Sequence, residues 1–196
     1  MSEVVYSDPR QRTHALHLGL WLFLGSETLL FAGLFCLYAA YRASYPLVFR
    51  TGISHANVTL GTANTAVLII SSFCVAWAVH ALRGDRRRTC MIALACAIGL
   101  GALFLVFKFL EYGEHLHAGL GTGPARLFVT LYFMMTGLHA LHVLAGMTIL
   151  AWLVVRVRRG RTHAGHHTEL ELGGLYWHLV DIVWIFLWPL LYLTHQ

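Results

Sequence analysis

Long runs of apolar residues alternate with short polar segments along the chain. A helix of about 20 apolar residues crosses the hydrocarbon layer of a bilayer. Five runs are long enough for this, and they cover residues 16–41, 60–82, 90–110, 127–155 and 172–193. The segments between them are short, so we expect no soluble domain between the helices. The pattern therefore predicts a single membrane domain over residues 1–196, an all-α integral membrane bundle of five transmembrane helices.

The composition agrees with a membrane protein. Of the 196 residues, 58% are apolar and only 12% are charged, whereas a soluble domain carries about 25% charged residues. This excludes a soluble globule, a disordered tail and a fibrous repeat. The first apolar run is far longer than the roughly 7–15 apolar residues of a signal peptide, so we expect it to remain in the mature protein. Small residues inside the runs would let helices approach closely: Gly25, Gly33, Gly99, Gly101, Gly137 and Gly146.

Basic residues cluster at one end of the predicted bundle. The chain has a formal net charge of +5 and 14 Lys and Arg residues. Of these, 10 precede the first run or lie between the second and third runs or between the fourth and fifth runs. By the positive-inside rule the N-terminus is cytoplasmic and the C-terminus is outside. Because these basic groups form no continuous face, we expect no nucleic-acid partner.

Glu27 lies near the middle of the first predicted helix. A charge at the centre of a bilayer costs roughly 2.5–3.5 kcal/mol on insertion scales, so this carboxyl must face protein. Removal from water disfavours the charged form, and we therefore expect Glu27 to be neutral. Two roles fit such a group, a step in a proton relay or a hydrogen bond that ties two helices together. The second is the simpler interpretation.

Two further pairs of polar residues lie within the predicted helices, His139 with His142 and His178 with Asp181. Each pair has a spacing of three residues, which places its members on one face of a helix. An Asp one turn after a His is suited to fixing the orientation of the imidazole. The pairs and Glu27 could form one hydrogen-bonded network in the bundle. Histidines on two helices could alternatively hold a haem or a metal.

A polar cluster with Glu111 and Glu114 follows at the outer end of the third predicted helix. Its simplest interpretation is a solvated helix end and loop. The segment before the last helix carries several His and Glu residues, including Glu171. A solvated cytoplasmic loop is the simplest interpretation there too, and Glu171 would sit favourably at a helix N-terminus.

Read in order, these residues resemble a known family of membrane proteins. Residues 174–184, GLYWHLVDIVW, are similar to the Y-W-H-x-V-D-x-V-W closing helix of cytochrome c oxidase subunit III, a subunit of haem–copper terminal oxidases. Residues 136–143 resemble the family pattern T-G-x-H-x-x-H-V, and residues 111–114 resemble its E-Y-x-E. Ser26-Glu27 resembles the S-E pair that holds the family's buried carboxylate. Longer members have seven helices, and this chain resembles the last five, as five-helix bacterial members do.

The resemblance implies an accessory role. Subunit III of this family carries no haem, copper or other metal and has no catalytic centre, because the haems and copper belong to subunits I and II. It packs on subunit I, holds structural phospholipid and supports proton uptake and sustained turnover. Glu27 and Asp181 match acidic positions whose family role is chiefly structural. Arg156 matches a basic position that would contact a lipid head group, with His80 and Trp77 as weaker candidates.

The predicted function is thus a non-redox subunit of a proton-pumping oxidase that reduces oxygen to water in a bacterial cytoplasmic membrane. We expect cytochrome c as electron donor to the complex, with quinol as the alternative. A different class of protein, a stand-alone haem-binding cytochrome, would use His139 or His142 together with His178. A small transporter would use Glu27 and Asp181 for proton coupling. The sequence, however, lacks the broken helices that are expected at a midplane substrate site.

Overall fold

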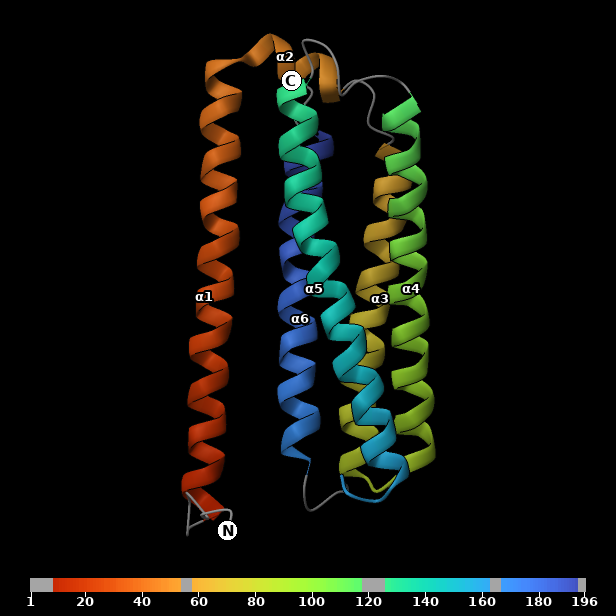
Figure 1. Ribbon diagram of the computed structural model, residues 1–196. Helices are drawn as coiled ribbons and strands as arrows, with labels where there is room; N and C mark the ends of the chain where they lie inside the picture. The colour runs from red at the N-terminus through yellow and green to blue at the C-terminus, as the bar shows by residue number, and fades with distance from the viewer. Residues whose placement is uncertain (1–8, 54–57, 118–125, 163–166, 194–196) are drawn as a thin grey trace.

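The computed structural model describes residues 9–53, 58–117, 126–162 and 167–193, and these ranges contain helices and turns but no strand (Figure 1). The elements in chain order are α1 (Pro9–Ser44), α2 (Pro46–Ile53), α3 (Val58–Arg83), α4 (Arg87–His117), α5 (Arg126–Arg158), α6 (Thr168–Trp188) and the π-helix η1 (Pro189–Leu193). The all-α prediction is confirmed.

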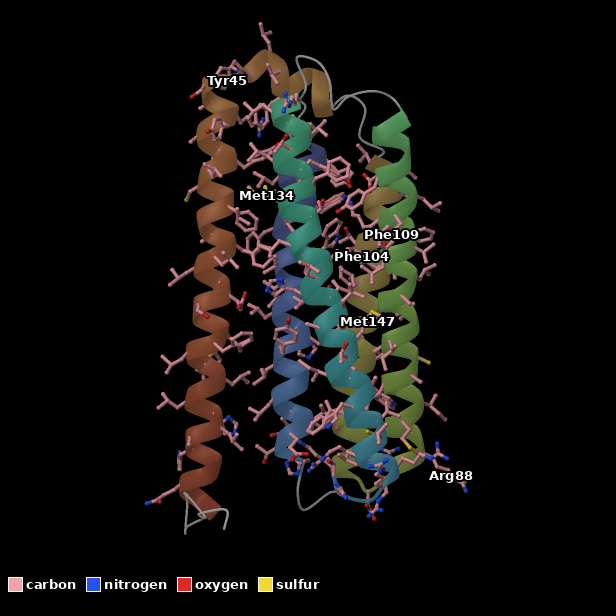
Figure 2. The ribbon with its side chains drawn as sticks, viewed as in Figure 1. Tyr45, Arg88, Phe104, Phe109, Met134 and Met147 are labelled. Atoms are coloured by element: carbon pink, nitrogen blue, oxygen red, sulfur yellow. The ribbon has the colours of Figure 1, made fainter. Side chains whose placement is uncertain are left out.

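In the part of the chain that the structure describes, five helices are long and apolar enough to cross a membrane; the first four contain their predicted runs, and the fifth covers its run except for Leu193. The first four helices extend beyond their runs at both ends, because polar residues continue the helix past the apolar part, whereas α6 starts before its run and ends at Trp188, where η1 begins. Figure 1 shows the start of α1 at the end of the bundle where α3 passes to α4 and α5 to α6, and the end of the chain at the opposite side. Arg88, labelled in Figure 2, projects at the first of these ends. Which end faces the cytoplasm stays a prediction.

The two tight connections at this basic end have the same backbone geometry. After α3, the amide of Arg86 donates to the carbonyl of Ala81 (2.9 Å) and the amide of Asp85 donates to Leu82 (3.0 Å). After α5, Gly160 occupies the position that Asp85 occupies after α3, and both residues have positive φ. This is the Schellman arrangement, which favours glycine at the left-handed position. The first connection therefore places an Asp where glycine is preferred, one residue after Gly84.

Helices α3 to α6 form the tightly packed part of the molecule, and Trp177 of α6 lies at its centre with 1% of its surface exposed. A Cβ atom added at Gly146 of α5 would lie 2.7 Å from the Trp177 ring, and one added at Gly101 of α4 would lie 2.9 Å from it. These two glycines therefore provide the close approach that the sequence predicts. At Gly25, Gly33, Gly99 and Gly137 no atom lies within 4 Å of an added Cβ, so the described structure does not need glycine there.

Helix α1 is attached differently, along one narrow seam. Its buried residues Leu24, Phe31 and Tyr38 are seven positions apart, which is the spacing of a helix that contacts its neighbours with a single stripe. The Tyr38 hydroxyl donates to the carbonyl of Leu190 in η1 (3.1 Å). In the most apolar stretch of α1 only 11% of the residues are buried, compared with 50% in the corresponding stretch of the span that contains α6. Figure 1 shows α1 at the edge of the bundle.

Candidate functional site: buried polar pairs and an apolar groove

Glu27 of α1 meets His142 of α5, with 2.7 Å between the carboxyl Oε2 and Nε2 of the ring. The other ring nitrogen, Nδ1, lies 2.8 Å from the carbonyl oxygen of Leu138. A carbonyl only accepts hydrogen bonds, so Nδ1 carries a proton. The Glu27–His142 contact therefore holds one further proton, which belongs either to a neutral carboxyl or to an imidazolium. Both forms give a strong hydrogen bond between α1 and the bundle.

His139, one turn before His142 on the same helix, lies in an aromatic cage. Its ring is fully buried, with ring centroids 5.1 Å from Trp184, 5.6 Å from Phe104 and 6.5 Å from Phe31. Neither ring nitrogen has a hydrogen-bond partner among the residues that the structure describes. The two histidines of α5 thus share Phe31 as a neighbour, but only His142 bonds to Glu27.

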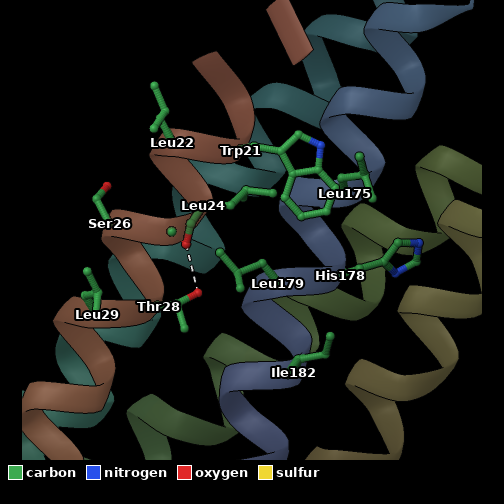
Figure 3. A pocket seen from close by; sticks show the side chains of 11 residues that line it. Trp21, Leu22, Leu24, Ser26, Thr28, Leu29, Leu175, His178, Leu179 and Ile182 are labelled. Carbon is green, nitrogen blue, oxygen red and sulfur yellow. Dashed lines mark hydrogen bonds between the residues drawn. The ribbon is translucent and has the colours of Figure 1, made fainter. Parts of the chain in front are cut away.

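His178 of α6 contacts a residue that sequence reasoning missed, Ser72 of α3. The Ser72 hydroxyl oxygen lies 2.6 Å from Nδ1 of His178. Asp181 is 6% exposed, and its Oδ1 has no hydrogen-bond partner among the described residues. Figure 3 shows His178 pointing away from α1. The observed contacts pair His178 with Ser72 and His142 with Glu27, and the single network considered above stays a prediction.

Glu111 is not at a solvated helix end, as the sequence suggested, but is only 2% exposed. The reason is Lys108, one turn earlier on α4, whose ammonium nitrogen lies 2.8 Å from Glu111 Oε2. The same nitrogen donates to the hydroxyls of Tyr192 (2.6 Å) and Tyr132 (3.2 Å). The Tyr192 hydroxyl in turn donates to Glu111 Oε1. Lys108 and Glu111 therefore form a closed, buried ion pair that joins α4, α5 and η1.

All three ammonium protons and both carboxylate oxygens of this pair are used within the chain. The ammonium group also lies 4.6 Å from the centre of the Trp184 ring, a cation–π contact. A lysine near the end of an apolar helix gives no sequence signal for such burial, because lysine there usually extends to the interface. The one sequence feature that suggests a partner for Lys108 is Glu111, three residues later. The side chain of Glu114 lies outside the described residues.

At the basic end, acidic residues at the start of α6 pair with arginines of other helices. Arg156 donates to Glu169 (2.6 Å), and its guanidinium lies 4.9 Å from the centre of the Trp152 ring. Arg83 pairs with Glu171. The proposed lipid contact Arg156 is thus part of an ion pair, and its head-group role remains untested. Trp77 and His80 lie on α3 with ring centroids 5.7 Å apart, and 45% of Trp77 is exposed.

A groove of about 740 Å³ runs between α1 and α6 (Figure 3). Leucines from both helices, Trp21 and Ile182 make its walls apolar, and the exposed Leu22 and Leu29 lie at its edge. A second groove of about 360 Å³ lies against α3 and reaches Arg83 and Glu171. Both grooves are lined by Leu175 and His178, so they border the same stretch of α6.

The family follows from comparison with known proteins. The model of the family described as cytochrome c oxidase subunit III matches residues 7–195. The chain belongs to the cytochrome c oxidase subunit III family. It is 35% identical over 180 residues to cytochrome c oxidase subunit 3 of Thermostichus vulcanus, covering 90% of this chain and 86% of the relative.

Other subunit 3 relatives agree. The protein of Synechocystis sp. is 34% identical over 89% of this chain and 74% of its own length. The protein of Lumbricus terrestris is 35% identical over 92% of this chain and 70% of its own length. As a subunit III, the chain is a multi-pass membrane protein with a general role as an oxidase accessory subunit. Among the described residues, no group of three or more His, Cys, Asp and Glu side chains could hold a metal ion.

Proposed function

We propose that this chain is the non-redox subunit III of a proton-pumping haem–copper oxidase that reduces oxygen to water in a bacterial cytoplasmic membrane. It packs on subunit I, works beside subunit II, and supports proton uptake and sustained turnover without a catalytic centre of its own. Cytochrome c is the proposed electron donor to the complex, and a quinol is the alternative. The haems and copper belong to the partner subunits.

The observation that carries the proposal is how the polar groups are used. His142 bonds to Glu27 and Lys108 bonds to Glu111 inside the chain, and both ring nitrogens of His142 have partners. An axial haem ligand must offer a free ring nitrogen. These groups are therefore suited to fixing helices in place, which is what an accessory subunit requires.

The groove between α1 and α6 is the proposed phospholipid site. Its apolar walls suit an acyl chain, because inside a bilayer apolar groups associate through close van der Waals packing. Arg156, His80 and Trp77 remain proposed head-group contacts. Arg83 joins them, because it lines the groove that shares Leu175 and His178 with the larger one. A bound lipid would support the weakly attached α1 against α6.

A groove-filling variant tests this proposal. Leu179→Trp adds bulk to the groove wall, and Leu141→Trp adds the same side chain at a residue of α5 that is 62% exposed. The purified oxidase is assayed for phospholipid content and for the number of turnovers before activity declines. We expect Leu179→Trp to lose bound lipid and to shorten active life at an unchanged initial rate, while Leu141→Trp keeps both. Equal lipid content and equal active life in the two variants would contradict the lipid role.

A further inference from the structure

Two polar groups in the driest part of the bundle have hydrogen-bonding atoms without a partner among the described residues. One is His139 of α5, which is fully buried and unpartnered at both ring nitrogens. The other is Asn64 of α3, which is 1% exposed. The amide nitrogen of Asn64 donates to the carbonyl of Phe104 (3.3 Å), but its Oδ1 accepts nothing. A donor or acceptor in this position is unfavourable, because it has lost its bonds to water without replacing them.

Both groups contact Phe104 of α4, and Trp184 of α6 packs against Phe104. Phe104, labelled in Figure 2, has its carbonyl on Asn64 and its ring beside His139. The Trp184 ring lies 5.1 Å from His139 and 4.8 Å from Phe104, centre to centre. Its indole N–H donates to the hydroxyl of Thr65 (3.0 Å), the residue after Asn64. Asn64 and His139 therefore approach the same part of the core from α3 and α5.

The nearest strong hydrogen-bond donor on α4 does not serve His139. Lys108 lies one turn after Phe104, but its three protons go to Glu111, Tyr132 and Tyr192. A neutral imidazole has one N–H donor and one acceptor nitrogen, and an amide oxygen accepts only. One molecule that accepts from the ring N–H and donates to Oδ1 would satisfy the donor of His139 and the acceptor of Asn64. Water does this, and buried waters commonly occupy such positions.

We propose that an ordered water molecule binds in the core between α3, α4, α5 and α6. Its oxygen accepts the N–H of His139, and one of its protons is donated to Oδ1 of Asn64. The water links α3 to α5 across the aromatic pair of Phe104 and Trp184. It also gives His139 a structural function that requires a neutral imidazole and no metal or haem.

The proposal is tested on the full-length chain in the purified oxidase with His139→Phe, Asn64→Leu and the double variant. Phe preserves the aromatic contacts of His139, and Leu preserves the size of Asn64. If one water serves both residues, each single change lowers the melting temperature, and the double change lowers it no further than the more harmful single change. If the two shifts add, or if His139→Phe raises the melting temperature, the water bridge is wrong.

Ser71→Ala is the matched control for this cycle. Ser71 is a buried polar residue of α3 with its own partner, the carbonyl of Ala97 (3.0 Å). Its shift in melting temperature should add to that of His139→Phe. An experimental density map of the unmodified oxidase, at a resolution that shows buried waters, tests the proposal directly and without variants. Density within hydrogen-bond distance of both a His139 ring nitrogen and Asn64 Oδ1 supports the proposal, and a map without that density overturns it.

Discussion

The four-helix core of α3 to α6 and helix α1 are held in the molecule by different interactions. The core is closely packed, with glycines against Trp177 and a buried ion pair between Lys108 and Glu111. Helix α1 contacts it along a single stripe, and the Glu27–His142 pair joins the two. Lipid tails are as apolar as leucine, so apolar area alone does not attach a helix in a bilayer. Close packing holds the core, and specific hydrogen bonds matter more for α1.

The Lys108–Glu111 pair in the core and the Glu27–His142 pair on α1 show the same contrast. The side chains of Lys108 and Glu111 are 2% and 3% exposed, whereas those of His142 and Glu27 are 15% and 17% exposed. The buried pair has every proton and oxygen assigned, so removing one member leaves a charge without a partner. The pair on α1 holds one proton between two groups and can exist in neutral form. Loss of a charge should therefore be far more damaging in the core.

The largest expected effect is that of Lys108→Met. It leaves the Glu111 carboxylate buried beside Tyr192 without a cation, and breaking a buried pair in this way costs about 3–5 kcal/mol. Thermal unfolding of the purified full-length chain measures the loss. The double variant Lys108→Met with Glu111→Leu removes both charges and should regain most of the stability. A double variant as unstable as the single one would show that the charges are not what matters.

Gly146→Ala comes next and tests the packing of the core. The new Cβ would lie 2.7 Å from the Trp177 ring, and such overpacking costs about 1–3 kcal/mol. Gly137→Ala on the same helix is the control, because nothing lies within 4 Å of its Cβ. That change should be neutral or stabilise by up to about 1 kcal/mol through helix propensity. Equal melting temperatures for the two variants would contradict the close contact with Trp177.

On the α1 side, Glu27→Gln should have a small effect. A glutamine amide can still donate to Nε2 of a neutral His142, so the bond to α1 survives and the change costs about 1 kcal/mol or less. Co-purification of the variant with its partner subunits measures assembly. Glu27→Leu removes the bond and should weaken assembly more than Gln does. Complete loss of the complex in Glu27→Gln would mean that the negative charge itself is required.

The smallest expected effect is a gain, from Asp85→Gly in the α3–α4 connection. Asp85 has a φ of 54°, where glycine is favoured, and relief of this conformation should stabilise the chain slightly. The lost ion pair with Arg87 (3.6 Å) is exposed and contributes little. A slightly higher melting temperature is the expected result. A lower one would show that the ion pair outweighs the backbone preference.

The sequence predicts the fold better than it predicts the site. Segment length and hydropathy are sufficient for the five helices. The contacts between helices depend on rotation about each helix axis, which a nearly uniform apolar pattern does not encode. His139 and His142 share a face by spacing, yet one is caged by aromatics and the other bonds to Glu27. Ser72 gives no signal, because a serine on an apolar helix is common.

Some of what was missed was nevertheless present in the sequence. Leu24, Phe31 and Tyr38 repeat every seven residues, and this spacing would have predicted the seam of α1. Lys108 and Glu111 have the spacing of neighbours on a helix, which would have suggested an ion pair. What could not be predicted is that Tyr132 and Tyr192, distant along the chain, come to Lys108 and bury it.

One measurement tests the accessory role most directly. The oxidase is purified in mild detergent from its native membrane, this chain is stripped from it, and reduced-minus-oxidised spectra of both fractions are recorded with the co-purifying chains identified by mass. The account predicts that the haem spectrum stays with the larger partner subunits and that the isolated 22.0 kDa chain shows no haem band. A haem band that remains with the isolated chain and is lost on His178→Ala would contradict it and make the histidines ligands.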